Sequence, residues 1–321
     1  MSQQAILKLK QSISEKIIGQ TELIDRLLIA ILADGHLLVE GAPGLAKTRA
    51  IKVLGDCIEG DFHRIQFTPD LLPADLTGTE IYRPQEGSLN FQKGPIFHNL
   101  VLADEINREP AKVQSALLEA MGEQQVSVGN KTYPLPDLFL VMATQNPLEQ
   151  EGTYPLPEAQ LDRFLMQVNV GYPDAQSEAA ILQLIRSENI QGNTHVNSPP
   201  SVINQKDLMI ARQAVSNVHT AESLDNYIVQ LTMASRNPKN IDKELAQWIE
   251  YGVSPRATIS LDRCSKAHAF IQGNDFVTPD DIHAVIYDVF RHRLLLSFEA
   301  EAQGITKDQV IHRILEKVSI A

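Results

Sequence analysis

The hydrophobic positions in the first half of the chain gather in short runs that helical patterns separate. The runs are rich in Leu, Ile and Val and alternate little with polar residues. They occupy residues 36–40, 63–67, 100–104, 138–144 and 164–170. Such runs are typical of strands covered on both faces of a parallel sheet. Between them, stretches such as TELIDRLLIAILAD and EPAKVQSALLEAM repeat apolar residues at helical spacing. This alternation predicts an α/β fold with a mainly parallel sheet flanked by helices.

Two segments break the alternation and predict β-hairpins. Residues 81–93, IYRPQEGSLNFQK, alternate around Glu86 and Gly87, and residues 126–136, VSVGNKTYPLP, carry a Gly-Asn pair between β-prone residues. A turn pair between such residues is the usual signal of a hairpin. We therefore expect two hairpins inserted between core elements. Surface decoration without a further role is the alternative.

After Pro173 the strand-like runs stop and the pattern becomes mostly helical. Helix starts are marked at Ser254-Pro255 and Thr278-Pro279, where a hydroxyl cap precedes a proline in the first turn. A length of 321 residues also favours two domains. We therefore predict an α/β domain over residues 1–172 and a helical domain over residues 173–321.

The composition favours a water-soluble protein: 43% of residues are hydrophobic and 21% are charged. No run of about 18 apolar residues predicts a membrane span, and the N-terminus does not resemble an export signal. The two cysteines, Cys57 and Cys264, are too few for a disulfide framework or a zinc site. We expect a cytoplasmic protein that does not insert into membranes.

The net charge of −12 argues against nucleic acid as the main partner. A duplex-binding surface needs clustered Lys and Arg, and the sequence shows no such cluster. A small basic pore formed by an oligomer stays open as an alternative.

The segment GAPGLAKT has the pattern and context of a phosphate-binding loop. It comprises Gly41, Ala42, Pro43, Gly44, Leu45, Ala46, Lys47 and Thr48. It follows a predicted strand and leads into a helical segment, where backbone N–H groups can face phosphate oxygens. Lys47 would reach the β- and γ-phosphates of a nucleotide, and the Thr48 hydroxyl would bind Mg²⁺. A chance turn before a helix is the alternative.

The general loop pattern has glycine where this chain has Ala46. Glycine matters where φ is positive or where the backbone approaches another group closely. We expect a negative φ at this position, where the loop enters the helix, and hence tolerance of an alanine.

The segment LVLADEINREP delivers Asp104 and Glu105 at the end of a predicted strand, the edge where open α/β sheets bind ligands. Asp104 would belong to the Mg²⁺ shell, and Glu105 would orient and polarise the attacking water. Caps of the next helix are the alternative role for these acids. Asn146 ends the next strand and could bind the γ-phosphate or the water, although a polar residue before proline is also ordinary turn chemistry.

The order GAPGLAKT, LVLADEINREP, ATQNP, PEAQLDRF and GVSPRAT resembles the MoxR family of AAA+ ATPases over nearly the whole chain. The resemblance implies a P-loop NTPase fold, with a parallel five-stranded sheet between helices and a helical lid domain. The two hairpins resemble the helix 2 insert and the pre-sensor 1 insert of this branch. Alanine is common in the family at the position of Ala46.

The resemblance assigns three further roles. Asn146 matches sensor 1, Arg163 matches the arginine finger that reaches a neighbouring subunit, and Arg256 matches the sensor 2 arginine of the lid. An ion pair with Asp162 is the alternative for Arg163. Arg256 lies in the first turn of a helix capped by Ser254, where the helix dipole disfavours a cation unless an anion faces it, and this favours a phosphate partner for Arg256.

Ile17, Ile18 and Gly19 match the place where the family seats the adenine base, although core packing explains the isoleucines equally well. Gln66 ends the second predicted strand and could link the nucleotide state to the inserts. Arg108 could face a neighbouring subunit or solvent.

The function that the resemblance implies is an Mg²⁺-dependent ATPase with ATP as its nucleotide. It would work as a homo-oligomeric ring, a hexamer, in the chaperone-like maturation of partner proteins, often ones with von Willebrand factor A domains. The alternatives are a motor on nucleic acid, the ATPase subunit of a metal chelatase and a non-hydrolysing nucleotide sensor. A single lysine near the second hairpin tip, Lys131, and the acidic balance disfavour the motor.

Overall fold

A computed structural model describes residues 2–85, 87–147, 152–190 and 201–320. They form two compact units, one of Met1–Leu156 with Val168–Met209 and one of Pro157–Gln167 with Ile210–Ala321. The chain therefore passes between the units after Leu156, after Gln167 and after Met209, whereas the sequence pattern predicts one division at residues 172 and 173.

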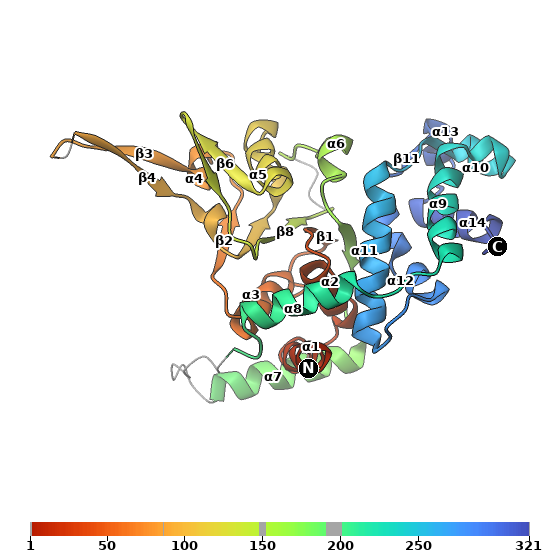
Figure 1. The fold of residues 1–321 in the computed structure, drawn as a ribbon, viewed down its shortest axis with the longest axis horizontal. Helices are drawn as coiled ribbons and strands as arrows, with labels where there is room; N and C mark the ends of the chain where they lie inside the picture. Colours follow the sequence, from red (N-terminus) through yellow and green to blue (C-terminus); the bar gives the residue numbers. More distant parts are fainter. Residues whose placement is uncertain (1, 86, 148–151, 191–200, 321) are drawn as a thin grey trace. The chain divides into compact units, whose positions relative to one another are not determined.

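The first unit is built on a five-stranded sheet with the strand order β2-β5-β8-β1-β9 (Figure 1). The strands are β1 (Leu37–Gly41), β2 (Phe62–Gln66), β5 (Leu100–Asp104), β8 (Leu140–Gln145) and β9 (Met166–Val170). The pairs β1–β8, β2–β5 and β5–β8 are parallel. Each predicted apolar run forms one of these strands, which confirms the α/β prediction.

Helices surround this sheet because its central strands are apolar on both faces. The residues of β8 are buried from Leu140 to Thr144, as are those of β5 from Leu100 to Ala103. The helices of this unit are α1 (Ser2–Ser14), α2 (Thr21–Leu32), α3 (Lys47–Cys57), α4 (Pro73–Thr77), α5 (Ala111–Glu123) and α7 (Ala175–Ile190), with 3₁₀ turns η1 (Pro95–Phe97) and η2 (Ile106–Arg108). Helix α8 (Gln205–Ser216) begins in this unit and ends in the second, since the division falls after Met209. The buried face of α2 supplies much of the core, from Leu23 to Leu32.

Both predicted hairpins are present. Strand β3 (Gly78–Arg83) pairs antiparallel with β4 (Ser88–Lys93), and β6 (Gln125–Val128) pairs with β7 (Lys131–Pro134). Figure 1 shows the β3–β4 hairpin extending away from the sheet as an arm. The rings of Phe91 and Tyr133 stack with centroids 4.0 Å apart, which joins the two hairpins. Glu86, at the first hairpin tip, lies outside the described residues.

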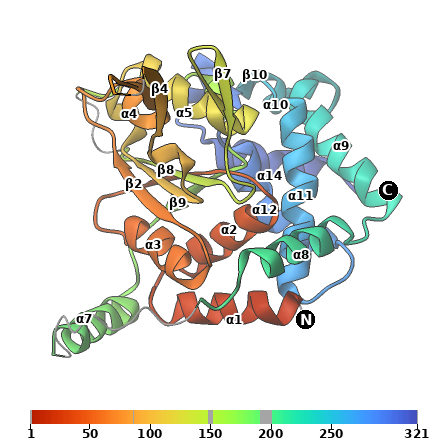
Figure 2. The ribbon, with the colours of Figure 1, turned by 60° about the vertical axis from the view of Figure 1, so that its left-hand side comes forward.

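The second unit is mostly helical, with α9 beside the long helix α11 in Figure 2. Its elements are α6 (Glu158–Leu161), α9 (Glu222–Arg236), η3 (Pro238–Asn240), α10 (Lys243–Trp248), β10 (Ile249–Tyr251), α11 (Pro255–Gln272), α12 (Pro279–Phe290), β11 (Leu295–Leu296), α13 (Phe298–Ala302) and α14 (Lys307–Lys317). The antiparallel pair β10–β11 is not in the all-helical expectation, because strands this short leave no periodic pattern.

Both predicted helix starts in this unit are confirmed. The Ser254 hydroxyl oxygen accepts a hydrogen bond of 3.1 Å from the backbone N–H of Arg256 at the start of α11. At the start of α12, the Oδ2 of Asp281 accepts hydrogen bonds of 2.7 Å from the backbone N–H of Thr278 and of 2.6 Å from its hydroxyl. None of the helices in the described part of the chain is long and apolar enough to span a bilayer.

Candidate active site

The predicted phosphate loop connects β1 to α3 and depends on two glycines. A Cβ atom on Gly41 would lie 2.7 Å from the carbonyl oxygen of Val170, so only glycine fits this close approach. Gly44 has a φ of +85°, in the left-handed region that glycine adopts without strain. The Lys47 Nζ donates a 2.6 Å hydrogen bond to the carbonyl oxygen of Gly41, which holds this side chain over the loop.

The expectation of a negative φ at Ala46 is wrong. Ala46 has φ of +58° and ψ of 15° and occupies the N-cap position of α3. The loop turns into the helix through a left-handed residue, a conformation that costs a residue with a Cβ about 1–2 kcal/mol. This geometry explains why the general pattern has glycine here and shows that the chain accommodates an alanine in a strained conformation.

Asp104 lies at the end of β5 and is fixed by neighbours on both sides. Its Oδ1 accepts a 2.6 Å hydrogen bond from the hydroxyl of Thr144 at the end of β8. Its Oδ2 accepts two hydrogen bonds from Arg64 on β2, of 3.0 Å from Nε and 2.6 Å from Nη2. The carboxylate is thus oriented at the edge of three neighbouring strands.

Glu105 leaves the strand in a left-handed conformation, with φ of +58° and ψ of 48°. Its Oε2 accepts a 3.1 Å hydrogen bond from Gln66 and lies 2.8 Å from the Nε of Arg108. Its side chain makes no capping bond at η2, within the described residues, so the capping alternative does not describe this acid. Strained residues of this kind concentrate at functional sites, and Ala46 and Glu105 are both strained here.

One cavity of about 390 Å³ brings the loop and the acids together. It is lined by Pro43, Gly44, Leu45, Ala46, Lys47, Thr48, Arg49, Arg64, Asp104, Glu105, Thr144, Gln145 and Asn146. The sheet explains this meeting, because the carboxyl ends of β1, β5 and β8 lie at one edge. Burial lowers the pKa of Lys47, while the charges of Asp104, Glu105 and Glu40 act in the opposite direction. The site therefore places three cationic side chains, Lys47, Arg49 and Arg64, and two acids around a space of ligand size.

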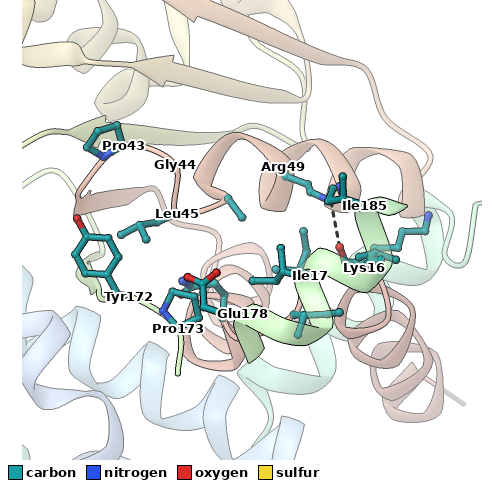
Figure 3. Close-up of a pocket in the computed structure, with 15 residues that line it drawn as sticks. Lys16, Ile17, Pro43, Gly44, Leu45, Arg49, Tyr172, Pro173, Glu178 and Ile185 are labelled. Atoms are coloured by element: carbon teal, nitrogen blue, oxygen red, sulfur yellow. Dashed lines mark hydrogen bonds between the residues drawn. The ribbon is translucent and has the colours of Figure 1, made fainter. Parts of the chain in front are cut away.

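A second cavity, of about 370 Å³, adjoins the same loop. Figure 3 shows Leu45 of the loop, Ile17 of the segment after α1 and Ile185 of α7 around it. Ile18 and Tyr172 also line this cavity, and Arg49 donates a 3.1 Å hydrogen bond to the Lys16 carbonyl at its side. The two cavities share the residues from Pro43 to Ala46 and Arg49. An apolar space beside a polar one suits a molecule with a flat apolar end and a polyanionic end.

Of the two arginines predicted in the second unit, Arg256 lies beside a carboxylate, that of Asp162. The Nη1 of Arg256 lies 3.8 Å from Oδ2 of Asp162, and the Ser254 hydroxyl donates a 2.7 Å hydrogen bond to Oδ1. An anion thus faces Arg256 within its own unit, so the helix-dipole argument no longer requires a phosphate. Arg163 directly follows Asp162, and its backbone N–H donates a 3.1 Å hydrogen bond to the carbonyl of Gln160.

Sequence reasoning missed Arg64 and Thr144. Arg64 lies two residues before Gln66 and so shares its face of β2, and the strand register pairs Gln66 with Asp104. Thr144 directly precedes the predicted Gln145-Asn146 segment. The signal that could have found both is their position near strand ends, once the strand order is known.

The chain matches two protein-family models. The ATPase family associated with various cellular activities (AAA) matches residues 36–166, and the AAA lid domain matches residues 243–314. The chain is 44% identical to Chaperone MoxR1 of Mycobacterium tuberculosis over 308 residues, 95% of this chain and 79% of the relative. It is 31% identical to Protein MoxR of Paracoccus denitrificans, with 88% and 86% of the two chains covered.

The chain belongs to the MoxR family of AAA+ ATPases.

The solved structures agree with this membership. A crystal structure from Cytophaga hutchinsonii, assigned as that of an ATPase, superposes with a TM-score of 0.91 at 47% identity, covering 100% of this chain and 96% of the other. As a MoxR-family AAA+ protein, the chain binds nucleotide and is an ATP hydrolase.

Proposed function

We propose that this MoxR-family ATPase requires Mg²⁺, hydrolyses ATP at sites completed between the subunits of a homohexameric ring, and uses the energy in chaperone-like maturation of partner proteins. The observation that carries the proposal is the cavity in which Asp104 and Glu105 face Lys47 and the phosphate loop. A base, a metal ligand and a phosphate-binding cation around one space are the parts that ATP hydrolysis needs.

Binding of ATP is assigned to the loop and to the adjoining apolar cavity. The backbone N–H groups of the loop from Gly44 to Thr48 and the Lys47 ammonium hold the phosphates. Ile18 and its neighbours around the second cavity seat the adenine base, as supported by the apolar side chains that line it (Figure 3). Arg256 acts as the lid arginine on the nucleotide of its own subunit, a role that the family resemblance supplies.

Thr48 and Asp104 would hold the Mg²⁺ ion, since a hydroxyl and a carboxylate are the oxygen ligands that this cation prefers. The ion neutralises charge on the β- and γ-phosphates when it is bound. Thr144 orients the Asp104 carboxylate through its 2.6 Å hydrogen bond, as groups behind a metal ligand commonly do. Arg64 contacts only the other oxygen, Oδ2, and its side chain is 48% exposed, so it can move aside at little cost.

Hydrolysis is assigned to Glu105, which orients and deprotonates the attacking water, with Asn146 beside it as sensor 1. Asn146 lines the same cavity and is 7% exposed, which limits the conformational freedom of its side chain. The hydrogen bond from Gln66 to Glu105 supports a switch, in which this amide holds the carboxylate away from water until the γ-phosphate is in place.

The arginine finger is Arg163, which reaches the γ-phosphate of the ATP bound to a neighbouring subunit. A cation supplied in trans stabilises charge that develops in the transition state and raises phosphoryl-transfer rates by about 10³–10⁵. Because the finger belongs to another copy of the chain, hydrolysis depends on assembly. An isolated subunit then has a binding site without its full catalytic constellation.

The hairpins are proposed to act on partner proteins, including ones with von Willebrand factor A domains. The relative in Mycobacterium tuberculosis is named a chaperone. Tyr82 and Leu89 on the β3–β4 hairpin are 59% and 55% exposed, which suits contact with apolar segments of a partner protein. The stack of Phe91 on Tyr133 lets the two hairpins move together. The net charge of −12 favours protein partners over nucleic acid, and we propose that the work takes place in the cytoplasm.

The test is ATP turnover per subunit against protein concentration, for the wild type, Glu105→Gln and the control Glu119→Gln, an exposed glutamate on α5. We expect turnover to rise with concentration and to need Mg²⁺. Glu105→Gln should retain ATP and lose turnover by about 10²–10⁴-fold, with Glu119→Gln unchanged. Turnover that is constant on dilution would contradict the ring, and turnover that survives EDTA would contradict the metal.

A further inference from the structure

Arg293 is a buried arginine whose guanidinium donates from all three nitrogens. Its side chain is 2% exposed. Its acceptors are the carboxylate of Asp162 at 2.9 Å, the carbonyls of Asp162, Phe164, Leu165 and Val289 at 3.3, 2.6, 3.1 and 2.6 Å, and the hydroxyl of Ser260 at 3.2 Å.

Four of these six acceptors flank one residue of the chain, Arg163. They are the Asp162 carboxylate and three of the four carbonyls, which lie on the residue before Arg163 and on the two residues after it. The Phe164 carbonyl lies also 3.1 Å from the Nε2 of His292. Burial and the neighbouring Arg293 charge keep the pKa of His292 well below its usual value, so this ring is neutral and stays a fixed part of the packing. The backbone on both sides of Arg163 is therefore tied to the end of α12.

The Asp162 carboxylate extends this attachment to the start of α11. Its Oδ1 accepts hydrogen bonds from Arg293 and from the Ser254 hydroxyl, which caps α11, and its Oδ2 lies 3.8 Å from Arg256. Ser254 and Arg293, which lie 92 and 131 positions after Asp162 in the sequence, thus both bond its side chain. The segment that carries Arg163 and the helix start that carries Arg256 share one anchor.

The neighbouring arginine shows what an ordinary buried ion pair looks like in this unit. Arg291 pairs with Asp288 on its own helix and with Asp308 on α14, and donates to the carbonyl of Gln167. Arg291 thus has one acceptor near this segment, the Gln167 carbonyl, whereas four of the six acceptors of Arg293 lie on residues 162–165 and the other two are on Val289 and Ser260. A planar guanidinium holds several acceptors in a fixed geometry that an ammonium group cannot reproduce.

We propose that Arg293, together with Asp162, is a positioning residue that sets how Arg163 is presented to the neighbouring subunit. This inference rests on the proposed role of Arg163 as a finger. It adds that the finger is built on the same anchor as Arg256, so that the nucleotide sensed by one subunit influences hydrolysis in the next.

The experiment uses full-length Arg293→Lys, which keeps the charge and loses the planar fork. We expect unchanged ATP affinity and turnover lower by about tenfold to a hundredfold, because small misplacements of a catalytic group have effects of that size. Mixing with Glu105→Gln subunits should raise turnover, since those subunits supply an intact finger to the active sites of the variant. Arg291→Lys is the matched control and should keep wild-type turnover.

Two results would overturn the proposal. The first is wild-type turnover in Arg293→Lys. The second is slow turnover that mixing does not raise, because a defect in the subunit's own site or fold cannot be complemented in trans. If Arg293→Lys does not assemble, Asp162→Asn is measured in the same mixture, with the same expected rescue, and absence of rescue counts against the proposal.

A further variant, Arg163→Ala, separates the proposed finger role of Arg163 from the proposed positioning role of Arg293. If that variant is not rescued by mixing, the finger assignment itself fails. If it is rescued while Arg293→Lys turns over normally, only the positioning role fails.

Discussion

The molecule holds two arginine–aspartate pairs of similar chemistry and different surroundings. Arg64 donates two hydrogen bonds to Asp104 at the carboxyl edge of the sheet in the first unit, and its side chain is 48% exposed. Arg293 in the second unit bonds Asp162 and five further acceptors, and its side chain is 2% exposed. The first pair can rearrange around a ligand, while the second holds a stretch of backbone in place.

The difference shows two ways of fixing the geometry of the residues that we propose act in hydrolysis. At the carboxyl edge of the sheet the geometry comes from the backbone, with Gly41, Ala46 and Glu105 in positions that few residues accept. Around Arg163 the geometry comes from one side chain that gathers carbonyls from a separate segment. Substitutions should therefore have different consequences in the two regions.

The same substitution at the two arginines should separate them most strongly. Arg293→Gln removes one donor from the Asp162 carboxylate and one from each of four backbone carbonyls, and loss of one partner of a buried pair costs about 3–5 kcal/mol of unfolding free energy. Arg64→Gln removes an exposed pair and should cost about 0–1 kcal/mol. Urea denaturation of both variants measures the contrast. Equal losses would show that the exposed and buried pairs do not differ as described.

A smaller effect is expected at Gly41, where the first region depends on close backbone approach. Gly41→Ala places a Cβ 2.7 Å from the Val170 carbonyl oxygen and should cost about 1–3 kcal/mol, as overpacking does. The displaced loop should also bind ATP more weakly, measured by titration with a fluorescent ATP analogue. Wild-type affinity and stability together would mean that β1 adjusts without disturbing the loop.

The smallest effect is expected for Ala46→Gly. Relief of the left-handed conformation favours the glycine by about 1–2 kcal/mol, and the greater freedom of glycine in the unfolded chain offsets about 0.4–1 kcal/mol of this. We expect a net gain of about 1 kcal/mol or less and near wild-type turnover. A marked loss of ATP binding would show that the alanine methyl has a role of its own.

Much of the first region could be predicted because its signals are contiguous. Apolar runs predicted all five strands, and GAPGLAKT and the Asp104–Glu105 pair lie directly at strand ends. The φ of Ala46 could not be read from composition, because the need for a left-handed residue comes from how the loop joins the helix. Arg64 and Thr144 required the strand order, which the sequence pattern alone does not supply.

The second region was much less predictable. The sequence indicates only Arg163, its neighbour, as a partner for Asp162, yet the Asp162 carboxylate bonds Ser254 and Arg293, which lie far away in the sequence. Nothing local marks Arg293 as the residue that gathers these groups. A cluster assembled from three separated segments becomes visible only when the fold brings them together.

The central claim, a site completed between subunits, is tested most directly by mixing Arg163→Ala with Glu105→Gln at fixed total protein and following ATP turnover against the fraction of each. Each variant alone should be nearly inactive, and mixed rings should contain interfaces with an intact Glu105 on one side and an intact Arg163 on the other. We predict turnover that peaks at intermediate fractions, well above either pure variant. Turnover that never exceeds the weighted sum of the two would contradict the account.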